Sequence, residues 1–311
     1  MPMIGSSHLT TANDTTIAWS EMGSGPPLIL LHGMADSHRT WRLVAPRLAT
    51  RFHVFMLDLP GHGLSARPRA PYTLPWYADT VVAWMDAVGL DRAHICGHLY
   101  GGGIAQWMLL EHQRRVDRLA LVASGGLGRE VGTALRLATL PLVAPLLESP
   151  LFGAFTKPVL QWTYRAFAER DDPEIERLAR LSRAPNSGLA FRRTVSGCIG
   201  ICGQRHQTWH HIHRIEALPP IALFWGARDS IIPIHHAHEA ARRLGNVTVT
   251  EYPKCGHSPH LEEPELFAED LRQFLEDRRR EPAHVLSTTG KKRVGRPGRG
   301  SQARANPAKA A

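Results

Sequence analysis

The sequence is poor in cysteine and has no long apolar run. It has four cysteines in 311 residues and no C-x-x-C pair, which argues against a disulfide framework and favours a reducing compartment. No apolar stretch reaches the roughly 18 residues that a membrane span needs. The first residues, MPMIGSSHLTTANDTT, lack the basic and then apolar regions of a signal peptide. We therefore expect a cytoplasmic protein without a membrane span.

Acidic residues are missing from the C-terminal end. The formal net charge of +9 includes seven lysines and arginines after Glu281, so the remainder carries 9 − 7 = +2. This end is rich in Gly, Pro, Ala and Ser, and we predict that residues 281–311 form a disordered basic tail. Its GRP core loosely resembles an AT-hook, which binds the DNA minor groove. Weak, non-specific attraction to polyanions is the favoured interpretation, and we predict no specific nucleic-acid partner.

Short apolar runs alternate with helical patterns along most of the chain. After an expected hairpin around Asn13 and Asp14, the helical spacing of apolar residues predicts helices over 41–48, 74–88 and 264–275. This alternation predicts a mostly parallel, doubly wound sheet. The expected strands are 28–31, 53–57, 93–96, 119–123, 221–225 and 247–252.

One region breaks the alternation. Residues 127–217 show no clear strand pattern, and contain a leucine-rich, proline-punctuated stretch followed by charged helical segments. We predict a mostly helical cap over residues 127–217, inserted into a core made of residues 1–126 and 218–280. Its apolar face suggests a lid over a hydrophobic pocket, although the same leucines could simply pack the cap onto the core.

The stretch GHLYGG, residues 97–102, predicts a sharp turn between a strand and a helix. Gly97 and Gly101 remove side chains that would collide in such an elbow, and the Tyr100 amide lies at a helix N-terminus, where it could stabilise an oxyanion. The earlier stretch LLHGMADSH ends another strand in His-Gly. There, Gly33 allows a sharp turn that could aim the Met34 amide into the same cleft.

An acid and a histidine follow the last two expected strands. Asp229 lies in FWGARDSIIP and His257 lies in PKCGHSPHLEEP. Because ligand sites of open parallel sheets lie beyond the carboxyl ends of the strands, Asp229 is placed to orient His257 as a base. Three further histidines compete for the role of base, namely His32, His98 and His260.

Together these motifs, over about residues 10–279, resemble the α/β-hydrolase superfamily, in particular its cap-bearing, esterase- and epoxide-hydrolase-like branch. The resemblance implies an α/β-hydrolase fold, an acid at Asp229, a base at His257, and oxyanion donors at Met34 and Tyr100. It also implies a nucleophile at position 99, where this sequence has leucine.

Leucine cannot attack a substrate, so a covalent intermediate at Leu99 is excluded. Of the nearby alternatives, Cys96 is expected to be buried on its strand, and neither Ser65 nor Ser124 has an elbow. An epoxide hydrolase or dehalogenase of the family would need Asp at this position, so leucine argues against both.

Three functions remain open. The chain could be a hydrolase for a hydrophobic ester-like molecule with impaired or water-mediated activity. It could use Asp229 and His257 as a plain base, as cofactor-free oxygenases and cyanohydrin-cleaving lyases of the superfamily do. It could instead bind an apolar ligand under the cap without catalysis. We predict no cofactor and no metal site, including in the histidine-rich stretch 206–213.

Overall fold

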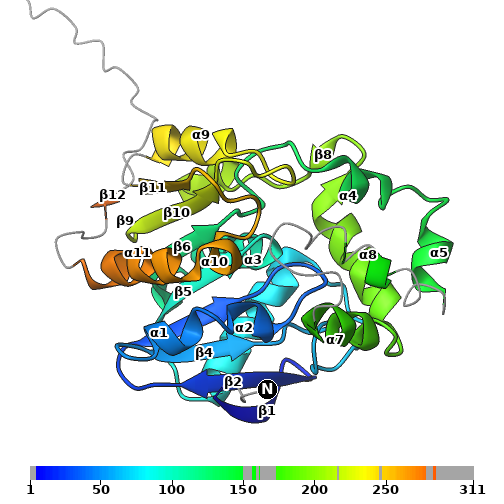
Figure 1. Ribbon diagram of the computed structural model, residues 1–311, viewed down its shortest axis with the longest axis horizontal. Coiled ribbons are helices and arrows are strands. Elements are labelled where there is room, and N and C mark those ends of the chain that lie inside the picture. Colours follow the sequence, from blue (N-terminus) through cyan, green and yellow to red (C-terminus); the bar gives the residue numbers. More distant parts are fainter. Residues whose placement is uncertain are drawn as a thin grey trace, which may run out of the picture.

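The computed structural model describes residues 5–149, 156–158, 161, 173–215, 217–244, 247–277 and 283–284. Its centre is an eight-stranded sheet in the order β1-β2-β4-β3-β5-β6-β10-β11 (Figure 1). From β4 onward in this order, neighbouring strands are parallel, whereas β1–β2 and β2–β4 are antiparallel. The predicted α/β-hydrolase fold class is confirmed. The strands are β1 (Ser6–Ala12), β2 (Thr15–Met22), β3 (Pro27–Leu31), β4 (His53–Leu57), β5 (Ala93–His98), β6 (Val116–Val122), β10 (Ile221–Gly226) and β11 (Val247–Tyr252).

The predicted hairpin is present at the start of the sheet. Asn13 and Asp14 connect β1 to β2 with positive φ angles of 49° and 55°, as a two-residue type I′ turn requires. Asn13 also donates a hydrogen bond to Thr80 Oγ1 at 2.8 Å, which fastens the turn to α2 (Leu74–Ala87).

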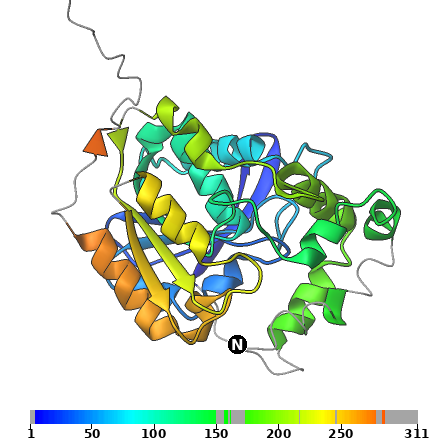
Figure 2. The same ribbon diagram turned by 90° about the horizontal axis from the view of Figure 1, so that it is seen from above.

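Helices cover both faces of the sheet (Figure 2). Side chains of a strand alternate between the faces, so that Ile29 and Leu31 pack with α2 and α3 (Tyr100–Glu111), whereas Leu28 and Leu30 pack with α1 (Ala45–Leu48) and α11 (Pro264–Glu276). The expected helix over 41–48 is divided into η1 (His38–Trp41) and the short α1. The remaining elements of the core are η2 (Gln113–Arg115), α9 (His235–Leu244) and α10 (Pro259–Glu262).

The segment between β6 and β10 is mostly helical where it is described. Its described helices within residues 133–198 lie to one side of the sheet (Figure 1). It also contains short strands that the sequence pattern did not predict. Its helices are α4 (Thr133–Leu137), α5 (Ala144–Glu148), α7 (Pro173–Leu181), α8 (Ser187–Cys198) and η3 (Thr208–Arg214), and its strands are β7 (Ile199–Gly200), β8 (Gly203–Gln204) and β9 (Ala217–Leu218).

Two residues of the predicted disordered tail, 281–311, are described in the structure. Ala283 and His284 form β12, which pairs with β9 in an antiparallel arrangement, so this short stretch gains backbone hydrogen bonds. The rest of the predicted tail lies outside the described residues. None of the described helices combines the length and apolarity required to cross a bilayer.

The turn from β5 into α3 depends on very close backbone packing. A Cβ atom added to Gly97 would lie 2.4 Å from the Gly101 oxygen, and one added to Gly101 would lie 2.4 Å from the Leu31 oxygen. Both distances are far shorter than van der Waals contact, and the neighbouring atoms belong to the backbone of the central sheet or of α3 itself. The two glycines therefore allow α3 to begin directly against β3.

We expect Gly101→Ala to lower the free energy of unfolding by about 2–3 kcal/mol, because the new methyl group must push backbone atoms apart. The measurement is urea unfolding followed by circular dichroism. Gly103→Ala is the matched control in the same helix, since its added Cβ would lie 3.2 Å from a flexible Leu74 methyl group, and alanine favours helix by about 1 kcal/mol. Equal losses in the two variants would contradict the packing argument.

Candidate active site

Leu99 lies at the apex of the turn between β5 and α3. Its φ and ψ angles are 49° and −106°, a region that leucine rarely adopts and that costs about 1–3 kcal/mol. The backbone is held there by hydrogen bonds from Leu99 N to Val122 O and from Gly125 N to Leu99 O, both 3.0 Å long. The predicted elbow is present, with leucine at its apex.

His257 and Asp229 form a hydrogen-bonded pair. Asp229 follows β10 and His257 follows β11, and His257 Nδ1 lies 2.8 Å from Asp229 Oδ2. The other carboxylate oxygen accepts hydrogen bonds from the amides of Ile231 (2.8 Å) and Ile232 (2.9 Å). An ionised carboxylate in this position makes Nδ1 the donor, and leaves Nε2 of the neutral ring with its lone pair free to accept a proton.

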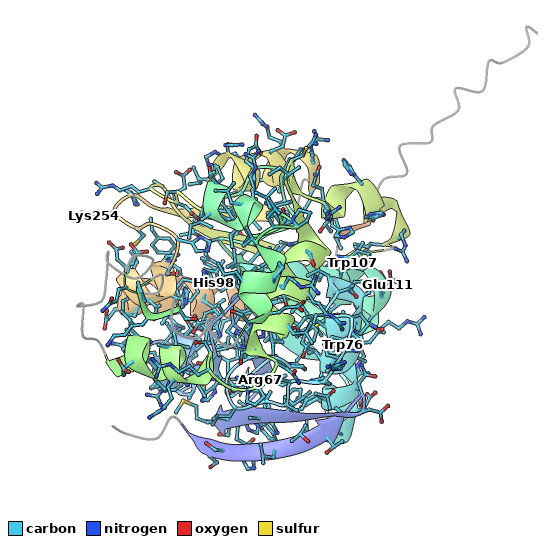
Figure 3. All side chains as sticks on the ribbon, turned by 90° about the vertical axis from the view of Figure 1, so that its right-hand side faces the viewer. Arg67, Trp76, His98, Trp107, Glu111 and Lys254 are labelled. Atoms are coloured by element: carbon cyan, nitrogen blue, oxygen red, sulfur yellow. The ribbon has the colours of Figure 1, made fainter. Side chains whose placement is uncertain are left out.

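The Nε2 atom of His257 is buried and has no hydrogen-bond partner among the described residues. The ring itself is placed beside the elbow by His98, the residue before Leu99 (labelled in Figure 3). His98 Nε2 donates a hydrogen bond to the His257 carbonyl oxygen at 3.1 Å, and the two rings lie 4.9 Å apart between centroids. Residues 99, 229 and 257 thus follow the strands β5, β10 and β11 at one edge of the sheet.

Leu99, Met34 and Tyr100 line one small cavity of about 30 Å³. Tyr100 is the first residue of α3, where backbone amides have no partner within the helix. The lining also includes residues of the segment between β6 and β10, namely Leu135, Cys198 and Ile199, so this segment borders the elbow. His257 is not among the described residues that line the cavity.

Gly33 is the position at which the loop after β3 meets the elbow. A Cβ atom added to it would lie 3.3 Å from the Cβ of Leu99 and 3.0 Å from Nδ1 of His98. The glycine therefore lets this loop, which carries Met34, pack directly against the apex residue.

The three competing histidines have structural surroundings. His32 Nε2 accepts a hydrogen bond from the Leu59 amide at 3.0 Å, and His260 Nε2 lies 3.0 Å from Thr40 Oγ1. Burial lowers the pKa of all three, to about 3 for His260 and well below the usual value for His98. Their rings are accordingly neutral at pH 7, and no carboxylate among the described residues is arranged for any of them as Asp229 is for His257.

The alternative nucleophiles are occupied or inert. Ser65 Oγ accepts from the Ala18 amide and donates to the Asp58 carbonyl. Ser124 Oγ accepts from Gln106 and donates to the Gly125 carbonyl. Burial raises the pKa of the fully buried Cys96 thiol, which disfavours the reactive thiolate. None of these groups replaces the missing elbow nucleophile.

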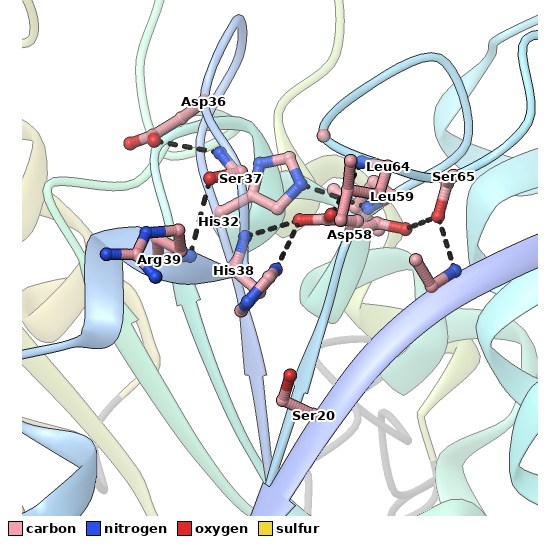
Figure 4. Close-up of polar contacts among 12 residues, drawn as sticks. Ser20, His32, Asp36, Ser37, His38, Arg39, Asp58, Leu59, Leu64 and Ser65 are labelled. Atoms are coloured by element: carbon pink, nitrogen blue, oxygen red, sulfur yellow. Dashed lines mark hydrogen bonds and ion pairs between the residues drawn. The ribbon is translucent and has the colours of Figure 1, made fainter. Parts of the chain in front are cut away.

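Asp58, to which the sequence analysis assigned no role, ties the Met34 loop to the loop after β4 (Figure 4). Its carboxylate accepts hydrogen bonds from the His38 amide (2.7 Å), from His38 Nδ1 (2.8 Å) and from the Leu64 amide (2.7 Å). Burial alone would raise the pKa of Asp58, but bonding to His38 brings it to about 2. The one available signal was that Asp58 follows a buried strand directly.

A larger cavity of about 520 Å³ lies apart from the elbow, where α8 begins. Its lining includes Arg69, Arg183, Arg192 and Arg193 but none of the predicted catalytic residues. Cavity size alone therefore does not identify the candidate active site.

Known proteins resemble this chain in sequence and in fold. The sequence model of the alpha/beta hydrolase fold family matches residues 26–264. An uncharacterized protein of Mycobacterium tuberculosis is 32% identical over 265 residues, covering 82% of this chain and 76% of that protein. The pimeloyl-[acyl-carrier protein] methyl ester esterase of Chromobacterium violaceum is 31% identical over 265 residues, covering 82% and 96%.

A solved structure of a bacterial membrane phospholipase A superposes with a TM-score of 0.71 at 27% identity, covering 87% of this chain and 85% of that one. The fold and the arrangement of motifs thus agree with the sequence comparison. The chain belongs to the alpha/beta hydrolase family.

The positive φ angle at position 99 predicts how substitutions there change the free energy of unfolding. We expect Leu99→Gly to be more stable than Leu99→Ala by about 1 kcal/mol, because only glycine adopts this conformation without strain. Urea unfolding measures both variants. The control compares the unaltered chain with Ala83→Gly. Ala83 lies within the regular helix α2, where replacing alanine by glycine costs about 1 kcal/mol. A more stable alanine variant at position 99 would show that the elbow is unstrained.

Proposed function

We propose that the protein is a hydrolase for a hydrophobic, ester-like small molecule, in which His257 activates water directly and no acyl-enzyme forms. One observation carries this proposal. The His257 ring is held by Asp229 through Nδ1, and its buried Nε2 has no partner among the described residues. A base that is oriented and desolvated but has no nucleophile to deprotonate is suited to deprotonating a bound water.

The proposed reaction is a single addition and elimination. His257 Nε2 takes a proton from water while the water oxygen attacks the ester carbonyl. The amides of Met34 and Tyr100 donate hydrogen bonds to the resulting oxyanion. The carbon–oxygen bond to the alcohol then breaks, and the proton on His257 passes to the departing alkoxide, which regenerates the neutral base.

The surroundings of the elbow support an apolar substrate. Apolar side chains from the core and from residues 127–217 line the cavity at Leu99. In the proposed mechanism the described residues of this segment that line the cavity contact the apolar part of the substrate. The methyl ester esterase named above supports an ester-like substrate.

We expect slow hydrolysis of p-nitrophenyl esters by the unaltered chain, and a fall of about 100-fold or more in kcat/KM for His257→Ala, since general-base catalysis contributes about 10²–10⁴-fold. Pre-steady-state kinetics are expected to show no burst of nitrophenol. His238→Ala, which alters a partly exposed residue paired with Glu251, is the control and should retain full activity. Unchanged activity in His257→Ala would rule out the proposed base.

Restoring a hydroxyl at the apex tests the geometry from the opposite direction. We expect Leu99→Ser to increase kcat/KM by at least about 10³-fold, because losing the nucleophile costs about 10⁶-fold in a serine hydrolase. This variant should also be labelled by a fluorophosphonate, and the label should disappear in the double variant with His257→Ala. A serine variant that is neither faster nor labelled would show that His257 does not reach position 99.

A second candidate function is the binding of an apolar ligand without catalysis. The observation that favours it is that apolar side chains dominate the cavity lining, which His257 does not join. Saturable binding of a fluorescent fatty ester, together with no hydrolysis above the rate of His257→Ala, would favour this candidate over the hydrolase.

A further inference from the structure

We propose that Glu130, His235 and His236 form a binding site for a zinc-like divalent cation. A potential ligand atom from each of the three side chains lies within 4.8 Å of those from the other two. Glu130 follows β6 where the chain leaves the core, whereas the two histidines begin α9. This proposal is independent of the hydrolase mechanism.

Of the three potential ligands, His236 is held in place by burial, whereas the side chains of His235 and Glu130 are exposed and can rotate. The side chain of His236 is 2% exposed, whereas those of His235 and Glu130 are 60% and 62% exposed. Glu130 Oε2 lies 2.6 Å from His236 Nε2 and 3.6 Å from His235 Nε2. Ligand atoms around tetrahedral zinc are about 3.4 Å apart, so small rotations of the two exposed side chains are enough to admit the ion.

Gly128 keeps the fixed ligand in place. A Cβ atom added to it would lie 2.2 Å from Cδ2 of His236, which shows that the imidazole packs against the Gly128 backbone.

The donor set selects the class of metal. Two imidazoles and one carboxylate are typical ligands for zinc and are poorly suited to calcium or magnesium, which prefer oxygen donors. The sequence suggested no metal site because its ligands are more than 100 residues apart and form no spaced motif.

A bound ion would reinforce an existing junction between the chain leaving the core and the loop that holds the catalytic acid. Gly132 N already donates to Ile231 O at 2.8 Å, and the Ile231 amide in turn donates to Asp229. Residues 130–132 and 229–236 thus lie side by side. The ion would cross-link these two segments on the outer side of the loop.

The test is zinc binding by the full-length, untagged chain after treatment with a chelator. Equilibrium dialysis against Zn²⁺ is expected to show one zinc fewer per chain for His235→Ala, and at least 10-fold weaker binding for Glu130→Gln. His238→Ala, in the same helix but outside the cluster, should bind as the unaltered chain does. Gly128→Ala should also lose this zinc although it removes no ligand.

Thermal unfolding provides the second measurement. Because an ion that binds only the folded state stabilises it, zinc is expected to raise the melting temperature of the unaltered chain by several degrees more than that of His235→Ala. Equal zinc content and equal shifts in these two proteins would overturn the proposal, and would leave Glu130 and His236 as a simple hydrogen-bonded pair. Since residues 130 and 235 are exposed, their variants are expected to fold even where Gly128→Ala does not.

Discussion

The direct contact of α3 with the backbone of the central sheet is the constraint on which the site depends. Because Gly97 and Gly101 leave no side chain between α3 and the neighbouring strands, the chain must reverse direction within one residue. That residue is Leu99, and its positive φ angle is the geometric result of the close approach. The apex side chain is therefore positioned by its neighbours, whatever its own chemistry.

This separation between geometry and chemistry explains how a leucine can occupy the elbow while the rest of the site persists. Asp229 is anchored by the amides of Ile231 and Ile232, and His257 is anchored by Asp229 and through its own carbonyl by His98. None of these bonds uses the side chain at position 99. The paired side chains of His257 and Asp229 thus keep their orientation whatever the side chain at position 99, and Asp58 secures the loop that carries Met34 in the same independent way.

Much of the core was predictable because its signals are local. A parallel strand buried on both faces is a short apolar run, and the turn at Asn13 and Asp14 requires residues that tolerate positive φ. The position of Leu99, Asp229 and His257 after strands expected to be parallel was enough to predict that they lie at one sheet edge, since all parallel strands end there.

What escaped prediction depends on contacts between distant segments. The strands β7, β8 and β9 have two residues each, which is too short for an alternating pattern. The expected helix over 41–48 is interrupted between Trp41 and Ala45. The sequence did not predict this interruption, because the spacing of apolar residues indicates which residues are buried and does not indicate which turns are closed by hydrogen bonds. The hydrogen bonds between Asp58 and His38 likewise join the loop after β4 to the start of η1. Neither local sequence pattern predicts this contact.

Membership of the alpha/beta hydrolase family establishes the fold of this chain but not its activity. The alpha/beta hydrolase fold arises from glycine packing, strand burial and loop anchoring, and all of these are satisfied here with leucine at the apex. A substitution at position 99 therefore changes the available chemistry while leaving the fold intact, so that fold and activity vary independently. In the proposed function, the His257 nitrogen that has no partner among the described residues needs a proton donor, and Leu99 cannot supply one. The donor must therefore come from a molecule that reaches the space around Leu99.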